Sequence, residues 1–152
     1  NHKTELEKCD YILCTGLYDS EMDKLNFYEK LLKNSTDKKM ICTNPDLIVD
    51  RGNITEYCAG AVAKIFEDLG GKVEYFGKPY PPVYQQATDI KNKKILCIGD
   101  NLNTDIKGAN IQNFDSMLIS SGIHKKEIDK NVEKVQLKYN VKIDYYQSLL
   151  KW

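Results

Sequence analysis

The sequence has no surplus charge, no long apolar run and no paired cysteine motif. Lys and Arg total 22 and Asp and Glu also total 22, so no net field attracts the chain to nucleic acid or to an anionic membrane. No run of about 18 apolar residues is present, and no charged-then-apolar leader is visible. These absences predict no nucleic-acid partner, no membrane partner and a cytoplasmic location.

Cysteine use supports the same compartment. The five cysteines are an odd number, contain no Cys-x-x-Cys pair and mostly lie in apolar runs. Reduced, buried thiols are the ordinary interpretation of such a pattern, and it assembles no zinc site.

Strand-like and helix-like segments alternate along the 152 residues, which predicts an α/β fold. The predicted boundary, near Phe76 or Gly77, gives parts 1–76 and 77–152. In the second part, Asn103 or Thr104 is expected to cap a helix through Ile111, whose Gly108 and Ala109 would approach the sheet closely. Strands are expected at Tyr11–Cys14, Met40–Thr43, Val73–Phe76, Ile95–Ile98 and Ser116–Ser120, and helices at 25–32, Ala59–Leu69, Val83–Ile90 and Lys125–Tyr139.

Two aspartates follow the apolar run that begins at Ile95. Asp100 comes directly after Gly99, and Asp105 follows five residues later. A carboxylate at the end of a parallel strand is well placed to bind Mg²⁺, which uses one or two protein carboxylates together with water and substrate phosphate. The alternative is that Asp100 starts a turn and Asp105 compensates a helix dipole. An EF-hand loop is disfavoured, because Ile106 stands where that loop needs glycine.

Lys78 lies in a Gly-Lys-Pro turn just before these segments. A lysine ammonium suits a phosphoryl oxygen or a carboxylate nucleophile. Most isolated lysines are surface residues, so its value comes from its place at the end of a predicted strand and ahead of the Asp100 strand.

The chain resembles the haloacid dehalogenase (HAD) superfamily, in the subfamily IIA group that includes p-nitrophenyl phosphatase-like and ribonucleotide monophosphatase-like enzymes. The resemblance implies an α/β fold made of the C-terminal half of a Rossmann-like HAD core and the second half of an α/β cap domain. The matches occur in order over about 80 residues and lie at 43–46, 58–61, 77–84, 99–105 and 121–122.

Carried over by position, the resemblance makes Lys78 the lysine that stabilises nucleophile and phosphoryl charge. Asp100 becomes a Mg²⁺ ligand, Asp105 the second acidic residue of the same motif with a catalytic or metal-binding role, and Asn101 a neighbour in the cleft. Residues 1–76 become a partial cap domain and 77–152 the rear half of the core. The cap loop Asn44-Pro45-Asp46 would face the cleft and help to select a small phosphorylated metabolite.

One element of the family pattern is absent. The family's nucleophile is the first aspartate of an Asp-x-Asp-Gly motif, and no Asp-x-Asp occurs in this sequence. The complete enzyme is expected to hydrolyse small phosphomonoesters through an aspartyl-phosphate, and this chain alone is expected to be inactive. A further expectation is that the exposed strand at Ile95 is covered by the missing N-terminal half of the same enzyme, by a second copy or by a rearranged core.

Two other classes remain open at this point. A noncatalytic HAD-like module would bind a phosphorylated ligand through Lys78 and the Asn44 loop without turnover. A receiver-like signalling domain also combines aspartates with a lysine, but there the lysine follows the acidic cluster, whereas Lys78 precedes Asp100.

Overall fold

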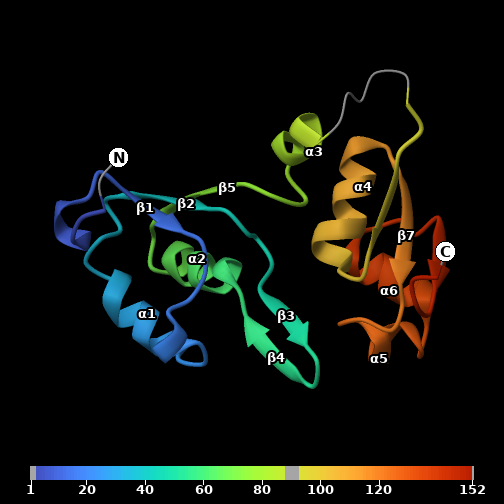
Figure 1. Cartoon of the computed structure of the whole chain (residues 1–152), viewed down its shortest axis with the longest axis horizontal. Coiled ribbons are helices and arrows are strands. Elements are labelled where there is room, and N and C mark those ends of the chain that lie inside the picture. Colours follow the sequence, from blue (N-terminus) through green and yellow to red (C-terminus); the bar gives the residue numbers. More distant parts are fainter. Residues whose placement is uncertain (1–2, 88–92, 152) are drawn as a thin grey trace. The chain divides into compact units, whose positions relative to one another are not determined.

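The computed structural model describes residues 3–87 and 93–151, and Figure 1 shows the course of the chain. Its contacts form two compact units, one ending at Phe76 and one beginning at Gly77. Each unit is an α/β structure with parallel strands, so the predicted fold class is confirmed. The assignment of the units to a cap and to a catalytic core stays a prediction.

A three-stranded parallel sheet forms the first unit, in the order β1-β2-β5. Helices α1 and α2 connect these strands and contact each other (Figure 1). The three strands and both helices match the sequence prediction within one residue or so. Their bounds are β1 Tyr11–Cys14, α1 Leu25–Leu32, β2 Lys39–Cys42, α2 Ala59–Asp68 and β5 Lys72–Tyr75, with 3₁₀ turns at Leu6–Lys8 and Asp19–Glu21.

The core of the first unit lies between α2 and the sheet. Phe66, Met40 and Cys42 are completely buried and belong to one apolar cluster with Tyr28 and Leu32 of α1. Burying such side chains fully stabilises a fold by about 1.5–3 kcal/mol each.

A β-hairpin in the first unit was not predicted. Strands β3, Ile48–Arg51, and β4, Ile54–Tyr57, are antiparallel and joined by a turn with Gly52 at φ +63°. All their residues except Glu56 are exposed. A strand without a buried face lacks the alternation of apolar and polar residues on which a sequence prediction depends.

The second unit holds another parallel sheet, in the order β6-β7-β8. Leu102, Ile106 and Leu118 are completely buried in its apolar cluster. The predicted helix end at Ile90 lies outside the described residues. The elements are α3 Pro81–Ala87, β6 Leu96–Gly99, α4 Lys107–Gln112, β7 Asp115–Ile119, α5 Lys125–Ile128, α6 Val132–Tyr139 and β8 Tyr145–Gln147.

The predicted helix cap after Asp100 was wrong. A π-helical turn, Leu102–Ile106, precedes α4, and its N-terminal cap is Asn101, whose side chain accepts a hydrogen bond from the Asn103 N–H at 2.9 Å. Asn103 therefore supplies the donor rather than the cap. Gly108 also differs from expectation, because the nearest atoms to its missing side chain belong to Tyr84 and Pro79 rather than to the sheet.

The predicted helix from Lys125 to Tyr139 is broken into two. Helix α5 ends at Ile128 and α6 begins at Val132. Asn131, between them, has an extended backbone, and its Oδ1 accepts a hydrogen bond from the Lys134 N–H at 2.8 Å. An asparagine that caps a new helix in this way cannot also continue the previous one.

None of the helices in ranges 3–87 and 93–151 has the length and apolar character needed to cross a bilayer.

Candidate functional site

Asp100 and Asp105 both follow the carboxyl end of β6. Gly99 is the last residue of that strand, Asp100 comes next, and Asp105 lies in the π-helical turn. Backbone N–H groups of Asp105 and Ile106 both donate to the Asn101 carbonyl, at 2.9 and 3.2 Å. π-helical turns are rare and frequently occur at functional sites.

Asp105 and Lys78 form an ion pair. Lys78 Nζ lies 2.5 Å from Asp105 Oδ1, and Asp105 Oδ2 accepts a hydrogen bond from the Asn101 N–H at 3.1 Å. The Asp105 side chain is only 9% exposed, whereas that of Lys78 is 46% exposed. The buried carboxylate is therefore fixed by protein donors, while the lysine side chain that it binds is about half exposed.

Gly99 is required by the position of Asp105. A Cβ on Gly99 would lie 2.2 Å from both Cγ and Oδ2 of Asp105. Any larger residue at the end of β6 would displace the carboxylate that holds Lys78.

The loop after β7 holds the second carboxylate. Asp100 Oδ2 accepts a hydrogen bond from the Ile123 N–H at 3.3 Å, and a Cβ on Gly122 would lie 2.2 Å from the same oxygen. Asp100 therefore follows one strand and is oriented by the loop that follows its neighbour, at the carboxyl ends of a parallel sheet.

His124 also lies in this loop and was not singled out from the sequence. Only 8% of the residue is exposed, and its ring packs edge-on against the Tyr139 ring at 4.9 Å between centroids. Burial lowers the pKa of His124, although the nearby Glu127 and Asp100 charges oppose that shift. No local sequence pattern marks a histidine whose surroundings come from a distant helix.

Asp100 is the better candidate of the two aspartates for a divalent cation. Both oxygens of Asp105 already accept from Lys78 and Asn101, so direct ligation there would compete with the ion pair. Within the described ranges, no group of three or more His, Cys, Asp or Glu side chains is placed to hold a metal. A single carboxylate fits Mg²⁺ only if water, substrate or other protein groups complete the shell.

The predicted cap loop belongs to the first unit. It follows β2, and the Asn44 side chain accepts from the Asp46 N–H at 3.1 Å. Gly60 at the start of α2 lies against it, since a Cβ there would be 2.2 Å from the Pro45 carbonyl oxygen. Lys78, Asp100, Asn101 and Asp105 all belong to the second unit, so a joint site with the Asn44-Pro45-Asp46 loop stays a prediction.

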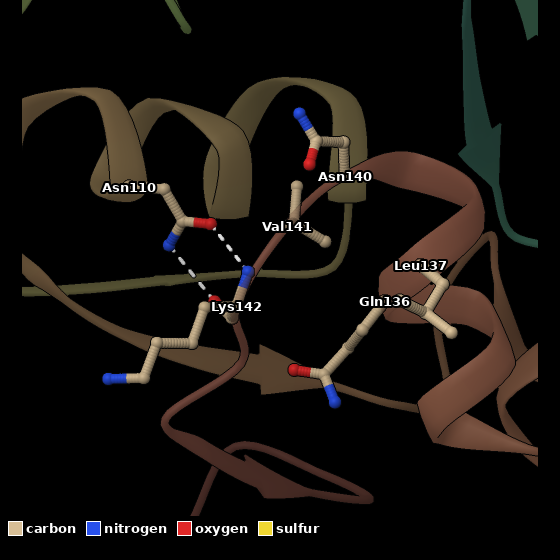
Figure 2. A pocket seen from close by; sticks show the side chains of 6 residues that line it. All are labelled: Asn110, Gln136, Leu137, Asn140, Val141 and Lys142. Atoms are coloured by element: carbon tan, nitrogen blue, oxygen red, sulfur yellow. Dashed lines mark hydrogen bonds between the residues drawn. The ribbon is translucent and has the colours of Figure 1, made fainter.

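A pocket of about 350 Å³ (Figure 2) lies at the amino ends of β7 and β8, which is the end of the second sheet opposite to Asp100. The side-chain amide of Asn110 donates to the Lys142 carbonyl and accepts from the Lys142 N–H, at 2.9 and 2.6 Å. The amide thus pairs with the backbone as a neighbouring strand would. The lining residues are Asn110, Gln136, Leu137, Asn140, Val141 and Lys142.

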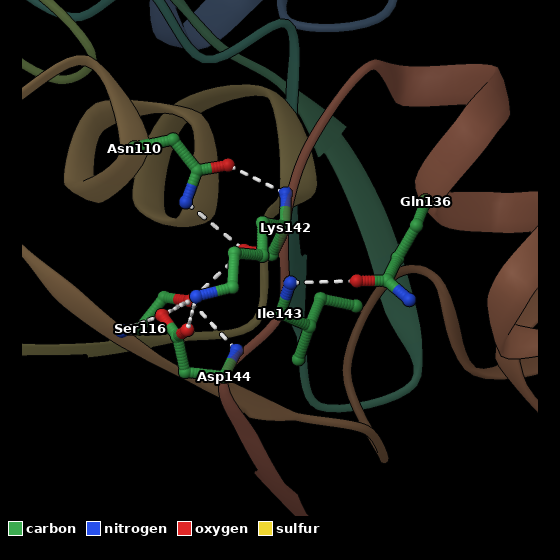
Figure 3. A network of polar contacts seen from close by, with 6 residues as sticks. All are labelled: Asn110, Ser116, Gln136, Lys142, Ile143 and Asp144. Atoms are coloured by element: carbon green, nitrogen blue, oxygen red, sulfur yellow. Dashed lines mark hydrogen bonds and ion pairs between the residues drawn. The ribbon is translucent and has the colours of Figure 1, made fainter. Parts of the chain in front are cut away.

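A polar network extends from this pocket (Figure 3). Buried Ser116 donates its N–H and its hydroxyl to Asp144 Oδ2, at 3.0 and 3.1 Å, and Gln136 Oε1 accepts from the Ile143 N–H at 2.7 Å. Because these polar groups bind one another at the amino ends of β7 and β8, they anchor the C-terminal segment and leave the Asp100 end as the candidate site.

Comparisons with known proteins show which proteins the chain resembles. The sequence model of the HAD-hydrolase-like family matches residues 75–145. Dihydroxyacetone phosphatase of Corynebacterium glutamicum (strain R) is 29% identical over 89 residues, which are 56% of this chain and 32% of that protein.

Two solved structures resemble this chain in both sequence and fold. A haloacid dehalogenase-like hydrolase from Brucella suis 1330 is 36% identical, with a TM-score of 0.74 over 81% of this chain and 49% of that one. A double mutant of thermostable NPPase from Geobacillus stearothermophilus is 27% identical, with a TM-score of 0.54 over 77% of this chain and 48% of that one. The chain therefore spans about half the length of these structures. Its sequence and fold resemble those of the HAD superfamily of hydrolases, among relatives that include phosphatases.

Proposed function

We propose that this chain supplies the lysine and a metal-binding aspartate of a HAD-type phosphatase that hydrolyses small phosphomonoesters. The observation that carries the proposal is the Lys78–Asp105 ion pair, at 2.5 Å, in the same unit as Asp100 and at the carboxyl ends of its strands. Lysine, carboxylate and parallel strand ends together suit phosphoryl chemistry.

Each side chain has a distinct role in this proposal. The ammonium of the half-exposed Lys78 side chain would contact a phosphoryl oxygen and stabilise the charge that develops there. Asp105 would orient Lys78, and Asp100 would hold Mg²⁺. When bound, Mg²⁺ would neutralise phosphoryl charge. The nucleophile would be an aspartate supplied from outside these 152 residues, which would accept the phosphoryl group before water releases it as phosphate.

The unpaired edge of β6 is an argument that another segment, which would carry this nucleophile, pairs with the strand. β6 is the first strand in the order β6-β7-β8, and no described strand pairs along its other edge. Leu96 on this strand is 43% exposed. An unpaired apolar edge is a template for another strand. We assign it to the N-terminal half of the same enzyme, with a second copy as the alternative, and the roughly twofold length of the relatives favours the first.

Substrate choice is assigned to the first unit. As a partial cap, it would present Asn44, Pro45 and Asp46 to the substrate. Its buried thiols Cys14 and Cys42 are free, in keeping with the reducing, cytoplasmic compartment proposed for the enzyme.

The test compares two proteins, this chain alone and this chain joined to an upstream segment that carries an Asp-x-Asp-Gly strand from a full-length relative. Hydrolysis of p-nitrophenyl phosphate is measured with and without Mg²⁺. We expect turnover only in the joined protein and only with Mg²⁺. Lys78→Met should lower kcat by about 10²–10³-fold, as loss of a transition-state charge contact does. Asp100→Asn should abolish the response to Mg²⁺.

Asp115→Asn is the matched control, because Asp115 is exposed at the amino end of β7. It should leave turnover unchanged. Mg²⁺-dependent turnover by the chain alone would contradict the assignment of the nucleophile to another segment. A folded joined protein that binds Mg²⁺ and phosphate without turnover would favour the noncatalytic binding module.

A further inference from the structure

Lys78 and Asp105 reach each other from separate segments of the second unit. Lys78 lies in the turn before α3, and Asp105 lies in the π-helical turn before α4. The two helices contact each other. The 2.5 Å separation of Nζ and Oδ1 therefore depends on how closely α3 packs against α4.

Gly108 is where these segments come closest. A Cβ on Gly108 would lie 1.8 Å from Tyr84 Oη, 2.8 Å from Tyr84 Cζ and 3.2 Å from the Cα of Pro79. No side chain fits at the first two distances. Pro79 is bonded to Lys78, and Gly108 follows Asp105 by about one helical turn. The close approach of Gly108 to Pro79 thus joins the residue after Lys78 to a residue about one helical turn after Asp105.

The Tyr84 side chain is held from another side as well. Its ring meets the Phe114 ring edge-on, at 6.1 Å between centroids and an angle of 70°. Burial, with smaller contributions from Cys97 and Asp105, raises the pKa of Tyr84 to about 12, so the phenol is neutral near pH 7. The Oη atom is buried and has no hydrogen-bond partner within ranges 3–87 and 93–151. Shape rather than polarity explains this contact.

We propose that the Tyr84 ring, seated on Gly108, positions Lys78 against Asp105 and so fixes the place where a phosphoryl oxygen would bind. The second half of this statement rests on the proposed function, whereas the first concerns geometry alone. Tyr84 is a positioning residue. Because the ring acts by shape, phenylalanine should replace it and alanine should not.

The experiment observes the lysine ammonium groups by ¹H–¹⁵N NMR in the whole chain. An ammonium held by a buried carboxylate exchanges its protons slowly, so Lys78 should give a protected signal that Lys78→Met identifies. We expect Tyr84→Phe to keep this signal, and Tyr84→Ala and Gly108→Ala to lose it. Gly16→Ala is the control, since nothing lies within 4 Å of a Cβ there, and it should keep the signal.

A second measurement links geometry to the ligand. Binding of inorganic phosphate in the presence of Mg²⁺, followed by ³¹P NMR, should weaken at least about tenfold in Tyr84→Ala, because a displacement near 1 Å has large effects on charge placement. Tyr84→Ala removes atoms and cannot clash, so it decides the matter even if Gly108→Ala unfolds.

A Lys78 signal that persists in folded Tyr84→Ala overturns the proposal, as does its absence from the unsubstituted chain. If the ammonium signals change as expected but none of the proteins binds phosphate, the proposed function is refuted and the positioning role of Tyr84 stands.

Discussion

Asp144 is an example of a charged side chain that serves stability rather than chemistry. Its carboxylate accepts two hydrogen bonds from Ser116 and forms an ion pair with Lys142 (Figure 3). Lys142 and the Ser116 donors lower the pKa of Asp144. Since Ser116 is completely buried, its N–H depends on Asp144, whereas its hydroxyl lies within hydrogen-bond distance of both Asp144 Oδ2 and the Lys142 carbonyl.

Asp144→Asn is therefore expected to lower the free energy of unfolding by about 1–3 kcal/mol at pH 7, the usual cost of disturbing a buried bond to a charged group. Because the folded state favours the ionised carboxylate, this contribution is present above the unfolded pKa of about 3.9 and is lost as pH falls through the lower folded value. Urea unfolding at pH 7 and at pH 3 measures both effects.

Glu133→Gln is the matched control, because Glu133 is exposed on α6 and its removal should change stability little. A difference between Asp144→Asn and the unsubstituted chain that grows toward pH 3 would contradict this account.

Among the elements, the junction of α5 and α6 depends on one residue. Asn131 caps α6 through its bond to the Lys134 N–H. Asn131→Ala should destabilise the second unit by about 1 kcal/mol, measured by urea unfolding. Lys130→Ala, an exposed neighbour, is the control. Equal stability of the Asn131→Ala protein would show that the break between the helices has another cause.

Elements with one buried face could be predicted from the sequence, and others could not. β2 is predictable because Met40 and Cys42 alternate toward the core. The β3–β4 hairpin has no such face. Asn131 looked like one more polar residue in a charged helix, because a cap is defined by the backbone around it rather than by residue type alone.

The candidate site shows the same limit. Gly99-Asp100 can be identified from the sequence because it follows an apolar run, and Lys78 can be identified because it lies in a Gly-Lys-Pro turn. The sequence predicts that Gly108 faces the sheet, because no sequence pattern reveals that a side chain from the preceding helix, Tyr84, fills the space beside it. Contacts between elements are nonlocal and escape such patterns.

For the whole molecule, the two units have separate apolar clusters. Phe66→Ala removes a completely buried ring from the first and should cost about 3–5 kcal/mol. Hydrogen exchange should then show reduced protection in β1, β2 and β5, with β6 and β7 little changed.

Leu137→Ala is its control, since Leu137 is 82% exposed and its loss leaves no cavity. Equal loss of protection in both sheets after Phe66→Ala would show that the units unfold as one cooperative body.

The pairing of Lys78 with Asp105 also determines the electrostatic balance at the end of the second sheet. The two charges cancel, burial favours neutral His124, and Asp100 is left as the uncompensated anion among these four side chains. A phosphate dianion arriving alone is repelled by that remainder, whereas a divalent cation is attracted. Under the proposed function, these charges would favour binding of an inorganic cation first and of a phosphorylated molecule second.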